Sequence, residues 1–312
     1  HISMIRNLLL IATALMGMTA SALTPKEWKK EAKGDINFMV VNDTGRNGYF
    51  YQKPVAELLG EVADAIGPEA ILALGDTHHY GGVQSVSDPL WMTNYELIYS
   101  NPELMADWLP ICGNHEYRGN TQAVIDYSNI SRRWNMPARY YTRTFNDNGT
   151  SVRIVFIDTT PLISKYRKDP ATYPDAEKQD PEAQLQWLDK TLADATEDWV
   201  VGHHPIYADT DKTEEERRDL QQSVDPILRK HKADMYICGH IHNFQHIRRP
   251  ESGIDYIVNT SGSKTRIPNQ TEGTVFCSDA PGFSVLTVDK KSLNLSMVDK
   301  DGNIIHKVTR KK

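Results

Sequence analysis

Short β-rich runs alternate with helical patterns along most of this chain, and this alternation limits the folds open to it. Ile36 to Val41 is β-rich, and apolar residues then recur at helical spacing from Val55 to Ile66, where Gly67 and Pro68 stop the helix. The same patterns predict strands at 70–74, 109–112, 152–157, 199–201, 235–238, 256–258, 283–288, 293–298 and 304–308, and helices through 124–134, 180–192 and 214–230. With no repeat and no long linker, this order predicts one α/β domain with two packed sheets.

Metal-capable side chains follow five of these strands, directly or within a few residues. They are Asp43; Asp76 with His78 and His79; Asn114 with His115 and Glu116; His203 with His204; and His240 with His242. A lone aspartate after a strand is usually a turn residue, and a lone histidine is usually structural. Five such groups instead indicate a shared site, because open α/β sheets bind their ligands at the carboxyl ends of the strands.

The residue types in these groups indicate which chemistry the site performs. Carboxylates, imidazoles and amide oxygens suit Fe, Mn or Zn, and a carboxylate can bridge two ions. The ligands are numerous enough for two metals, and His240 and His242 follow Gly239, which suits a tight turn toward one centre. Two ions about 4 Å apart can activate a water and clamp the attacking and leaving oxygens of a phosphoryl group.

The composition bears on two questions: whether the protein binds nucleic acid, and whether its cysteines form disulfides. The formal charge is −6 and the basic residues are scattered, so we do not expect nucleic acid as a structural partner. The three cysteines, Cys112, Cys238 and Cys277, show no paired spacing, and we expect Cys112 and Cys238 to be reduced core residues.

The amino end has the pattern of a secretory signal peptide. Arg6 precedes an apolar run from Leu8 to about Met18, and Thr19 to Ala22 resembles a cleavage site, while residues 1–3 look like a cloning remnant. The run is too short to span a membrane, although an uncleaved anchor or a buried helix is an alternative. We therefore expect residues 1–22 to be removed and residues 23–312 to form a single secreted or periplasmic domain without stable membrane insertion.

The ordered motifs VNDTG, GDTHHY, GNHE, VGHHP and CGHIHN resemble the calcineurin-like metallophosphoesterases, and among them the tartrate-resistant, purple acid phosphatases of the small animal type. The stretches IDYSNISRRWNMPARYY and QLQWLDKTLADATEDWVV extend the similarity over roughly residues 35 to 300. The resemblance implies a metallophosphoesterase fold, in which two packed mixed β-sheets are flanked by helices as an α/β/β/α sandwich. It also implies a dinuclear centre of Fe with a divalent ion such as Fe, Zn or Mn.

The resemblance also assigns roles to individual residues. It implies Asp43, His79 and His242 as ligands of a ferric ion, Asn114, His203 and His240 as ligands of a divalent ion, and Asp76 as the bridge. A metal-bound hydroxide would be the nucleophile. His115 would be the catalytic and substrate-binding residue, which contacts the phosphate or protonates the leaving alkoxide.

The chain departs from the family at the first metal. The purple phosphatases have a metal-binding tyrosine three residues after the bridging aspartate, whereas this chain has His79 there and Tyr80 one residue later. General members of the superfamily supply a histidine from the first motif, where this chain has Gly45. We predict that His79 replaces the tyrosine and favours a divalent ion, with ligation by Tyr80 through a shifted turn as the alternative.

A second departure follows the VGHHP motif. The family's pocket histidine, about nine residues after the metal ligand, is absent, and Asp209, Asp211 and Lys212 occupy this region. His204 is a candidate substrate-binding replacement, although a packing role is equally open.

Together these features predict an exported, monomeric phosphomonoesterase, similar to an acid phosphatase, that acts on small phosphate esters. A phosphodiesterase or nucleotide-processing hydrolase with the same centre is the first alternative. A non-catalytic binding protein is the second.

Overall fold

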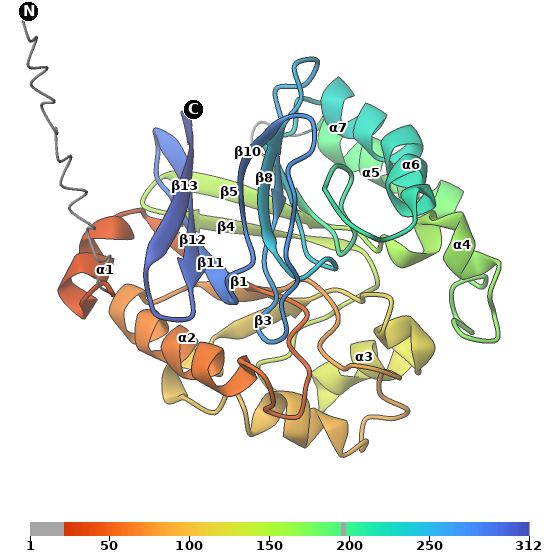
Figure 1. The fold of residues 1–312 in the computed structure, drawn as a ribbon, viewed down its shortest axis with the longest axis horizontal. Helices are drawn as coiled ribbons and strands as arrows, with labels where there is room; N and C mark the ends of the chain where they lie inside the picture. The colour runs from red at the N-terminus through yellow and green to blue at the C-terminus, as the bar shows by residue number, and fades with distance from the viewer. Residues whose placement is uncertain (1–21, 195–197, 312) are drawn as a thin grey trace, which may run out of the picture.

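Two packed β-sheets flanked by helices form the structure, a computed structural model that describes residues 22–194 and 198–311 (Figure 1). The predicted α/β/β/α fold class is therefore confirmed. The predicted signal peptide lies outside the described residues apart from Ala22. Among the helices that are described, none has both the length and the apolar character needed to cross a bilayer.

The first sheet has six strands in the order β13-β12-β11-β1-β2-β3. Its parallel part consists of β1 (Ile36–Val41), β2 (Ala70–Ala73) and β3 (Asp107–Pro110). Its antiparallel part consists of β11 (Gly282–Val288), β12 (Ser292–Asp299) and β13 (Ile304–Lys311). The chain thus returns from its C-terminal region to pair with the first strand.

The second sheet has seven strands in the order β10-β8-β9-β7-β6-β5-β4. Four neighbours pair in parallel: β5 (Thr150–Phe156), β6 (Asp198–Val201), β7 (Met235–Cys238) and β9 (Asp255–Val258). Antiparallel strands complete both edges: β4 (Tyr141–Asp147), β8 (Phe244–Arg248) and β10 (Thr274–Ser278).

Helices cover the outer faces of the sheets. Figure 1 shows α2 (Gln52–Ile66) beside the first sheet, and α5 (Pro181–Ala193), α6 (Glu214–Ser223) and α7 (Asp225–Lys230) beside the second. The other α-helices are α1 (Pro25–Glu31), α3 (Thr121–Asp126) and α4 (Ser164–Arg167). Short 3-10 or π turns occur at Met92–Glu96, Pro102–Met105, Glu116–Arg118, Tyr127–Asn129 and Thr160–Leu162.

Local sequence signals explain where the two longest helices begin and end. α2 ends at Gly67, which adopts a left-handed φ of 57° that glycine accommodates without steric cost. α5 begins after Asp180, whose side chain accepts a hydrogen bond from the Ala183 N–H, and Pro181 occupies the first turn. Both boundaries agree with the sequence-based expectations.

Aromatic side chains fill the interface between the two sheets. The ring of Phe38 on β1 lies 4.8 Å from that of Phe145 on β4 and 5.9 Å from that of Trp199 on β6. Phe38 and Trp199 are buried. Their contact fixes the two sheets against each other and so determines how the loops of one sheet face those of the other.

The expected helix through 124–134 was wrong in its second half. α3 ends at Asp126, and the chain then runs beside β3, because Trp108 N–H donates to the Arg133 carbonyl and Asn135 N–H donates to the Trp108 carbonyl. This strand-like pairing takes the place of helical hydrogen bonds. The strand β3 itself begins at Asp107, two residues before its predicted start.

The single helix expected over 214–230 is in fact two helices. α6 ends at Ser223 and α7 begins at Asp225, with Pro226 in its first turn. A proline lacks the N–H that a continuous helix would need at this position. The three cysteines are all free, as expected for Cys112 and Cys238.

Candidate metal centre

The predicted ligands come from loops at the carboxyl ends of both sheets. The loops after the first sheet's parallel strands carry Asp43, Asp76, His79 and Asn114, and those after β6 and β7 of the second sheet carry His203, His240 and His242. The structure brings all these loops together, so the site lies where the two sheets meet. Five loops that are separated along the chain therefore contribute to one cluster.

The backbone is strained at four of these residues. Asp43, Asp76, His240 and His242 have φ values of 52°, 54°, 72° and 61°, in the left-handed region that residues with a side chain rarely adopt. Each such conformation costs about 1–3 kcal/mol and persists only where the surrounding structure enforces it. Strain of this kind concentrates at functional sites, which supports a functional role for these turns.

Glycines permit the close approach of the loops. A Cβ atom at Gly113 would lie 2.2 Å from Asp76 Oδ1, and one at Gly239 would lie 2.6 Å from Asp43 Oδ2. Any larger residue at either position would displace a carboxylate of the cluster. The glycines of the GNHE and CGHIHN motifs are thus explained by packing against the two aspartates.

The first group of potential ligands consists of Asp43, His79 and His242. One ligand atom from each lies within 4.8 Å of the others, and His242 Nε2 is 3.2 Å from Asp43 Oδ1. His242 is oriented by its Nδ1, which is 2.7 Å from the Lys264 carbonyl oxygen. The structure thus brings together the three residues that the resemblance implies for the first metal, and their role as ligands stays a prediction.

Asp76 lies between this group and a second one. Its Oδ2 is 3.1 Å from His203 Nε2, 3.7 Å from His79 Nε2 and 3.9 Å from His115 Nε2. Asp43, Asp76 and His203 also form a group of ligand atoms within 4.8 Å of one another. A carboxylate in this central place has the position that a bridging ligand requires.

Several buried polar atoms of the cluster have no hydrogen bond. They are Asp43 Oδ1, His79 Nε2, Asn114 Oδ1 and His203 Nε2. Buried polar atoms are almost always hydrogen-bonded, so unsatisfied ones need an explanation such as a bound ion. Asp43 Oδ1 and His203 Nε2 do lie close to His242 Nε2 and Asp76 Oδ2, but without hydrogen-bond geometry. Four potential ligand atoms without hydrogen bonds in one place fit the two metal ions that the sequence predicts.

His240 is held by contacts on two sides. Its backbone N–H donates to Asp43 Oδ2 at 2.8 Å, and its Nε2 lies 2.9 Å from Glu216 Oε2. The ring of His203 lies 5.1 Å away. Because Glu216 occupies Nε2, the Nδ1 atom of His240 is the one left to bind a metal.

His79 and Tyr80 have very different surroundings. His79 is buried, and its Nδ1 is 3.2 Å from the Gly45 carbonyl oxygen while its Nε2 faces Asp76. Tyr80 is 62% exposed and stacks under the guanidinium of Arg46, 4.7 Å away. The structure therefore places His79 within the cluster and Tyr80 outside it, and metal binding by His79 stays a prediction.

His115 lies at the solvent side of the cluster. Its Nδ1 is 2.7 Å from the Tyr80 carbonyl oxygen, which makes Nδ1 the donor and leaves Nε2 facing Asp76. The His115 side chain is 14% exposed, more than the predicted ligands His79, His203 and His242. Its position suits contact with a substrate phosphate, as predicted.

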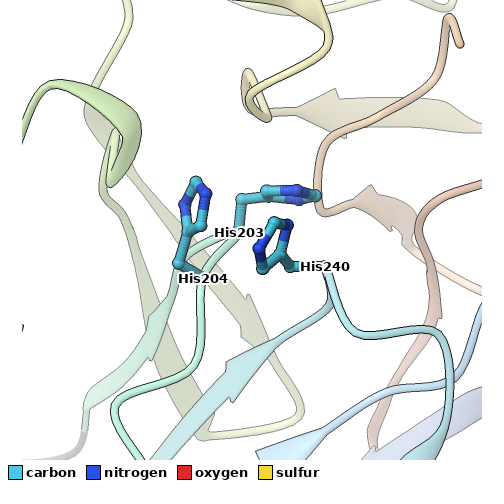
Figure 2. A group of neighbouring side chains, drawn as sticks. All are labelled: His203, His204 and His240. Carbon is cyan, nitrogen blue, oxygen red and sulfur yellow. The ribbon is translucent and has the colours of Figure 1, made fainter. Parts of the chain in front are cut away.

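His204 is fully enclosed by protein. Its Nδ1 lies 2.8 Å from Thr159 Oγ1 and its Nε2 lies 3.0 Å from the Tyr166 hydroxyl. Its ring lies 4.8 Å from that of His203, at 90° to it, and 4.3 Å from that of His240, and Figure 2 shows the three side chains next to one another. With both nitrogens occupied, His204 has the surroundings of a packing residue, the alternative that the sequence left open.

The two aspartates favour their ionised forms. Burial alone would raise the pKa of Asp43, but the neighbouring imidazole of His242 outweighs burial and holds that pKa below its ordinary value. Burial likewise opposes ionisation of Asp76, and the imidazoles of His203 and His115 keep its pKa well below the usual range. Both carboxylates are thus available as metal ligands.

The imidazoles differ in their proton affinity. Burial lowers the pKa of His79 well below its ordinary value, and it lowers the pKa of His240 to about 4 although Glu216 opposes this. Burial also opposes protonation of His203, but the adjacent Asp76 carboxylate outweighs it and raises the pKa of His203 to about 10. His79 and His240 are therefore neutral at pH 7, while His203 holds a proton that a metal would displace.

Two buried glutamates support the site: Glu116, which the sequence placed among the metal-capable side chains without a role, and a second one that was missed at the sequence level. Glu116 accepts backbone N–H groups from Asp76 at 2.8 Å, His78 at 3.1 Å and Gly113 at 2.7 Å, and so ties two ligand loops together. Burial, with the Asp76 carboxylate, raises the pKa of Glu116 to about 7.

Glu216 on α6 is the second buried glutamate that supports the site. Its Oε2 contacts His240, and its Oε1 contacts Lys165 at 2.5 Å and the Tyr166 hydroxyl at 2.8 Å. Glu216 and Leu220 are four residues apart on the buried face of the helix. A glutamate at a buried helical position is a signal that could have identified it.

Comparison with known proteins agrees with this geometry. The family model for calcineurin-like phosphoesterases matches residues 36–244. The chain belongs to this family. Tartrate-resistant acid phosphatase type 5 of Oryctolagus cuniculus is 30% identical to it, over 95% of this chain and 96% of the relative. Purple acid phosphatase 4 of Arabidopsis thaliana is 29% identical, over 97% of this chain and 94% of the relative. The phosphoesterase is thus similar to these acid phosphatases over nearly its whole length.

Solved structures support the fold assignment of this phosphoesterase. A Plasmodium protein described as GAP50, the anchor in the inner membrane complex, has a TM-score of 0.74 at 22% identity, over 88% of both chains. Purple acid phosphatase PPD1 from yellow lupin has a TM-score of 0.61 at 14% identity, over 88% of this chain and 53% of the other. At these identities the likeness concerns the fold alone.

Proposed function

We propose that this phosphoesterase is an exported phosphomonoesterase, similar to an acid phosphatase, that hydrolyses small phosphate esters at a dinuclear metal centre. The observation that carries the proposal is the convergence of the predicted ligands around Asp76, with four buried donor atoms that lack hydrogen bonds. The acid phosphatases among its relatives support the choice of reaction.

In this proposal the ligands divide between two ions. Asp43, His79 and His242 would hold the first, Asn114, His203 and His240 the second, and Asp76 both. Bound ions would activate water and polarise the phosphoryl oxygens. We propose Fe with a divalent ion such as Fe, Zn or Mn, because the donors are imidazole, carboxylate and amide oxygen.

His115 has the catalytic role in this proposal. Because its Nδ1 donates to the Tyr80 carbonyl, its ring is fixed and Nε2 is the atom that reaches the substrate. That atom can hydrogen-bond a phosphate oxygen or donate a proton to the leaving alkoxide. Burial lowers the pKa of His115, which makes its protonated form a stronger acid.

Replacement of single ligands tests the proposal. We expect Asn114→Ala and His203→Ala to lose most turnover of phenyl phosphate, because each removes a ligand of the same ion. Metal content, measured by elemental analysis, should fall in parallel. Asn294→Ala, on β12 away from the centre, is the matched control and should retain full activity. Unchanged turnover in both ligand variants would refute the enzymatic assignment.

A diester substrate separates the monoesterase from its first alternative. A monoesterase should turn over phenyl phosphate much faster than diphenyl phosphate, whereas a diesterase should show the reverse preference. A non-catalytic binding protein would bind phosphate but hydrolyse neither ester.

We further propose that residues 1–22 are removed on export and that residues 23–312 act as a monomeric domain in the periplasm or outside the cell. The charged and apolar pattern of the amino end supports this part of the proposal. Amino-terminal sequencing of protein recovered from the periplasm or the medium should give a start near Leu23. Recovery of the uncleaved chain from the membrane fraction would contradict it.

A further inference from the structure

Arg46 is a buried cation for which the described part of the chain provides no counter-ion. The residue is 9% exposed, and its Nε and Nη1 atoms are buried without hydrogen-bond partners. No carboxylate among the described residues forms an ion pair with it. A buried charge without a partner is costly, so its presence indicates an anion that binds there.

The position of Arg46 relates it to the metal centre. The carbonyl of Gly45, the preceding residue, contacts His79 Nδ1, and the Arg46 guanidinium lies 4.7 Å from the Tyr80 ring centroid. The Tyr80 carbonyl in turn orients His115. Arg46 is therefore close to the buried His79, and Tyr80 links it to His115 at the solvent side of the cluster.

Two aromatic rings lie near this guanidinium, and a second cation, Lys264, contacts one of these rings. The Arg46 guanidinium lies 5.9 Å from the Phe50 ring centroid, and Lys264 Nζ lies 5.3 Å from the same centroid. Phe50 is 55% exposed, and the Lys264 carbonyl orients His242. We call Arg46, Phe50, Tyr80 and Lys264 the basic rim.

The basic rim lies beside His115, the proposed substrate-binding residue, because the Tyr80 carbonyl contacts His115 Nδ1. Its aromatic rings face solvent, and no contact joins Arg46 to the carboxylates of Asp43 or Asp76 in the described structure. We propose that Arg46 binds a second anionic group of the substrate, a carboxylate or phosphate on the alcohol part. This inference rests on the proposed function and specifies its substrate class as phosphate esters with an additional negative charge.

The chemistry of the guanidinium suits this role. Its planar fork can bind a carboxylate or phosphate through two parallel hydrogen bonds, which a lysine ammonium cannot reproduce. Its two edges are Nε with Nη2 and Nη1 with Nη2, and each edge contains one of the two atoms that lack partners, Nε and Nη1. An anion on either edge would thus satisfy a donor that the folded chain leaves unsatisfied.

A matched pair of esters tests the inference. Glycerol 2-phosphate and glycerate 2-phosphate differ by a carboxylate in place of a hydroxymethyl group. Arg46→Met should lower kcat/KM for glycerate 2-phosphate about 10- to 100-fold, the effect of losing a charged hydrogen bond, and should change it little for glycerol 2-phosphate. Arg46→Lys should fall between Arg46→Met and the unmodified protein. Arg143→Met, which removes an exposed arginine on β4, should affect neither ester.

Binding without turnover separates this inference from the proposed function. In calorimetry of the metal-loaded protein, Arg46→Met should weaken binding of 3-phosphonopropionate, a non-hydrolysable acid, but not of propylphosphonate. Suppose that the unmodified protein hydrolyses no ester, while Arg46→Met still weakens binding of 3-phosphonopropionate alone. In that case the proposed function fails and the role of Arg46 in binding a second anion stands. Equal weakening for both ligands and both esters, or no weakening for either, would overturn the inference.

Discussion

The protonation state of each imidazole determines how metal binding depends on pH. His203 has a pKa raised to about 10 by Asp76, so it is protonated at pH 7 in the metal-free chain. A metal binds the neutral ring, so loading should release about one proton from His203 at pH 7. Calorimetry in buffers of different ionisation enthalpy measures this release. Metal binding without proton release would show that His203 is already neutral or is not a ligand.

At the predicted ligand His240, protons should compete with the metal only in acid. Burial lowers its pKa to about 4, so its ring stays neutral as the pH falls from 7 to 5. Protonation competes with the metal only as the pH approaches 4. Metal affinity should therefore survive moderate acidity as far as His240 is concerned.

The residue at position 79 should determine the colour of an iron-loaded protein. His79 provides an imidazole where the purple phosphatases provide a phenolate, and only the phenolate gives iron(III) its strong visible charge-transfer band. We expect His79→Tyr to acquire such a band on loading with iron, and the unmodified protein to lack it. Visible spectroscopy measures this. Tyr80→Phe is the control: a band in the unmodified protein that Tyr80→Phe removes would identify Tyr80 as the ligand.

At the residue scale, the sequence predicted candidate ligands but not the residues that support them. Each candidate ligand follows a strand within a short motif, so local sequence was enough to propose it. The contacts of Glu216, and the lack of a counter-ion for Arg46 in the described structure, depend on the fold. Glu216 contacts His240, which is 24 residues away in the chain, and no short motif includes both.

Among the elements, buried parallel strands were easier to predict than edge strands. β1 and β7 are buried throughout and mostly apolar, and they were predicted with their exact bounds. β4 is largely exposed or half-buried, so its apolar signal is weak. β8 is buried but contains Gln245 and His246, whose polar groups are satisfied by Asp209, Asn243 and Asp255. Tertiary hydrogen bonds of this kind cannot be read from the strand itself.

Helix α6 should influence metal binding through Glu216. The carboxylate holds Nε2 of His240, while Lys165 and Tyr166 on α4 hold the carboxylate. Glu216→Gln keeps the shape but weakens the charge-assisted contact, so we expect about 10- to 100-fold weaker binding of one metal. Titration with Zn²⁺ followed by equilibrium dialysis measures this.

A neighbouring residue on the same helix provides the control for this prediction. Glu215 contacts Ser164 but no predicted ligand, so Glu215→Gln should bind both metals normally. Equal loss of affinity in the two variants would attribute the effect to the helix rather than to the carboxylate.

For the whole molecule, metals should stabilise the packing of the two sheets. Both sheets supply ligands, and these meet only in the folded chain. Binding to the folded state alone should add about 2.7 kcal/mol to the free energy of unfolding at a metal concentration 100 times the Kd. Denaturant unfolding with and without a chelator measures the increment. The increment should shrink in His203→Ala, and its persistence there would place the metal elsewhere.

The contact between Phe38 and Trp199 also affects the geometry of the proposed metal centre, because it sets the spacing between the two sheets. The first sheet carries Asp43, Asp76, His79 and Asn114, and the second carries His203, His240 and His242, so each proposed ion takes ligands from both sheets. A core substitution that thins the layer between the sheets, such as Phe38→Leu, would shift the ligands of one sheet relative to those of the other without changing a ligand. The thickness of the hydrophobic core therefore limits how well the two halves of each proposed ligand set fit one ion.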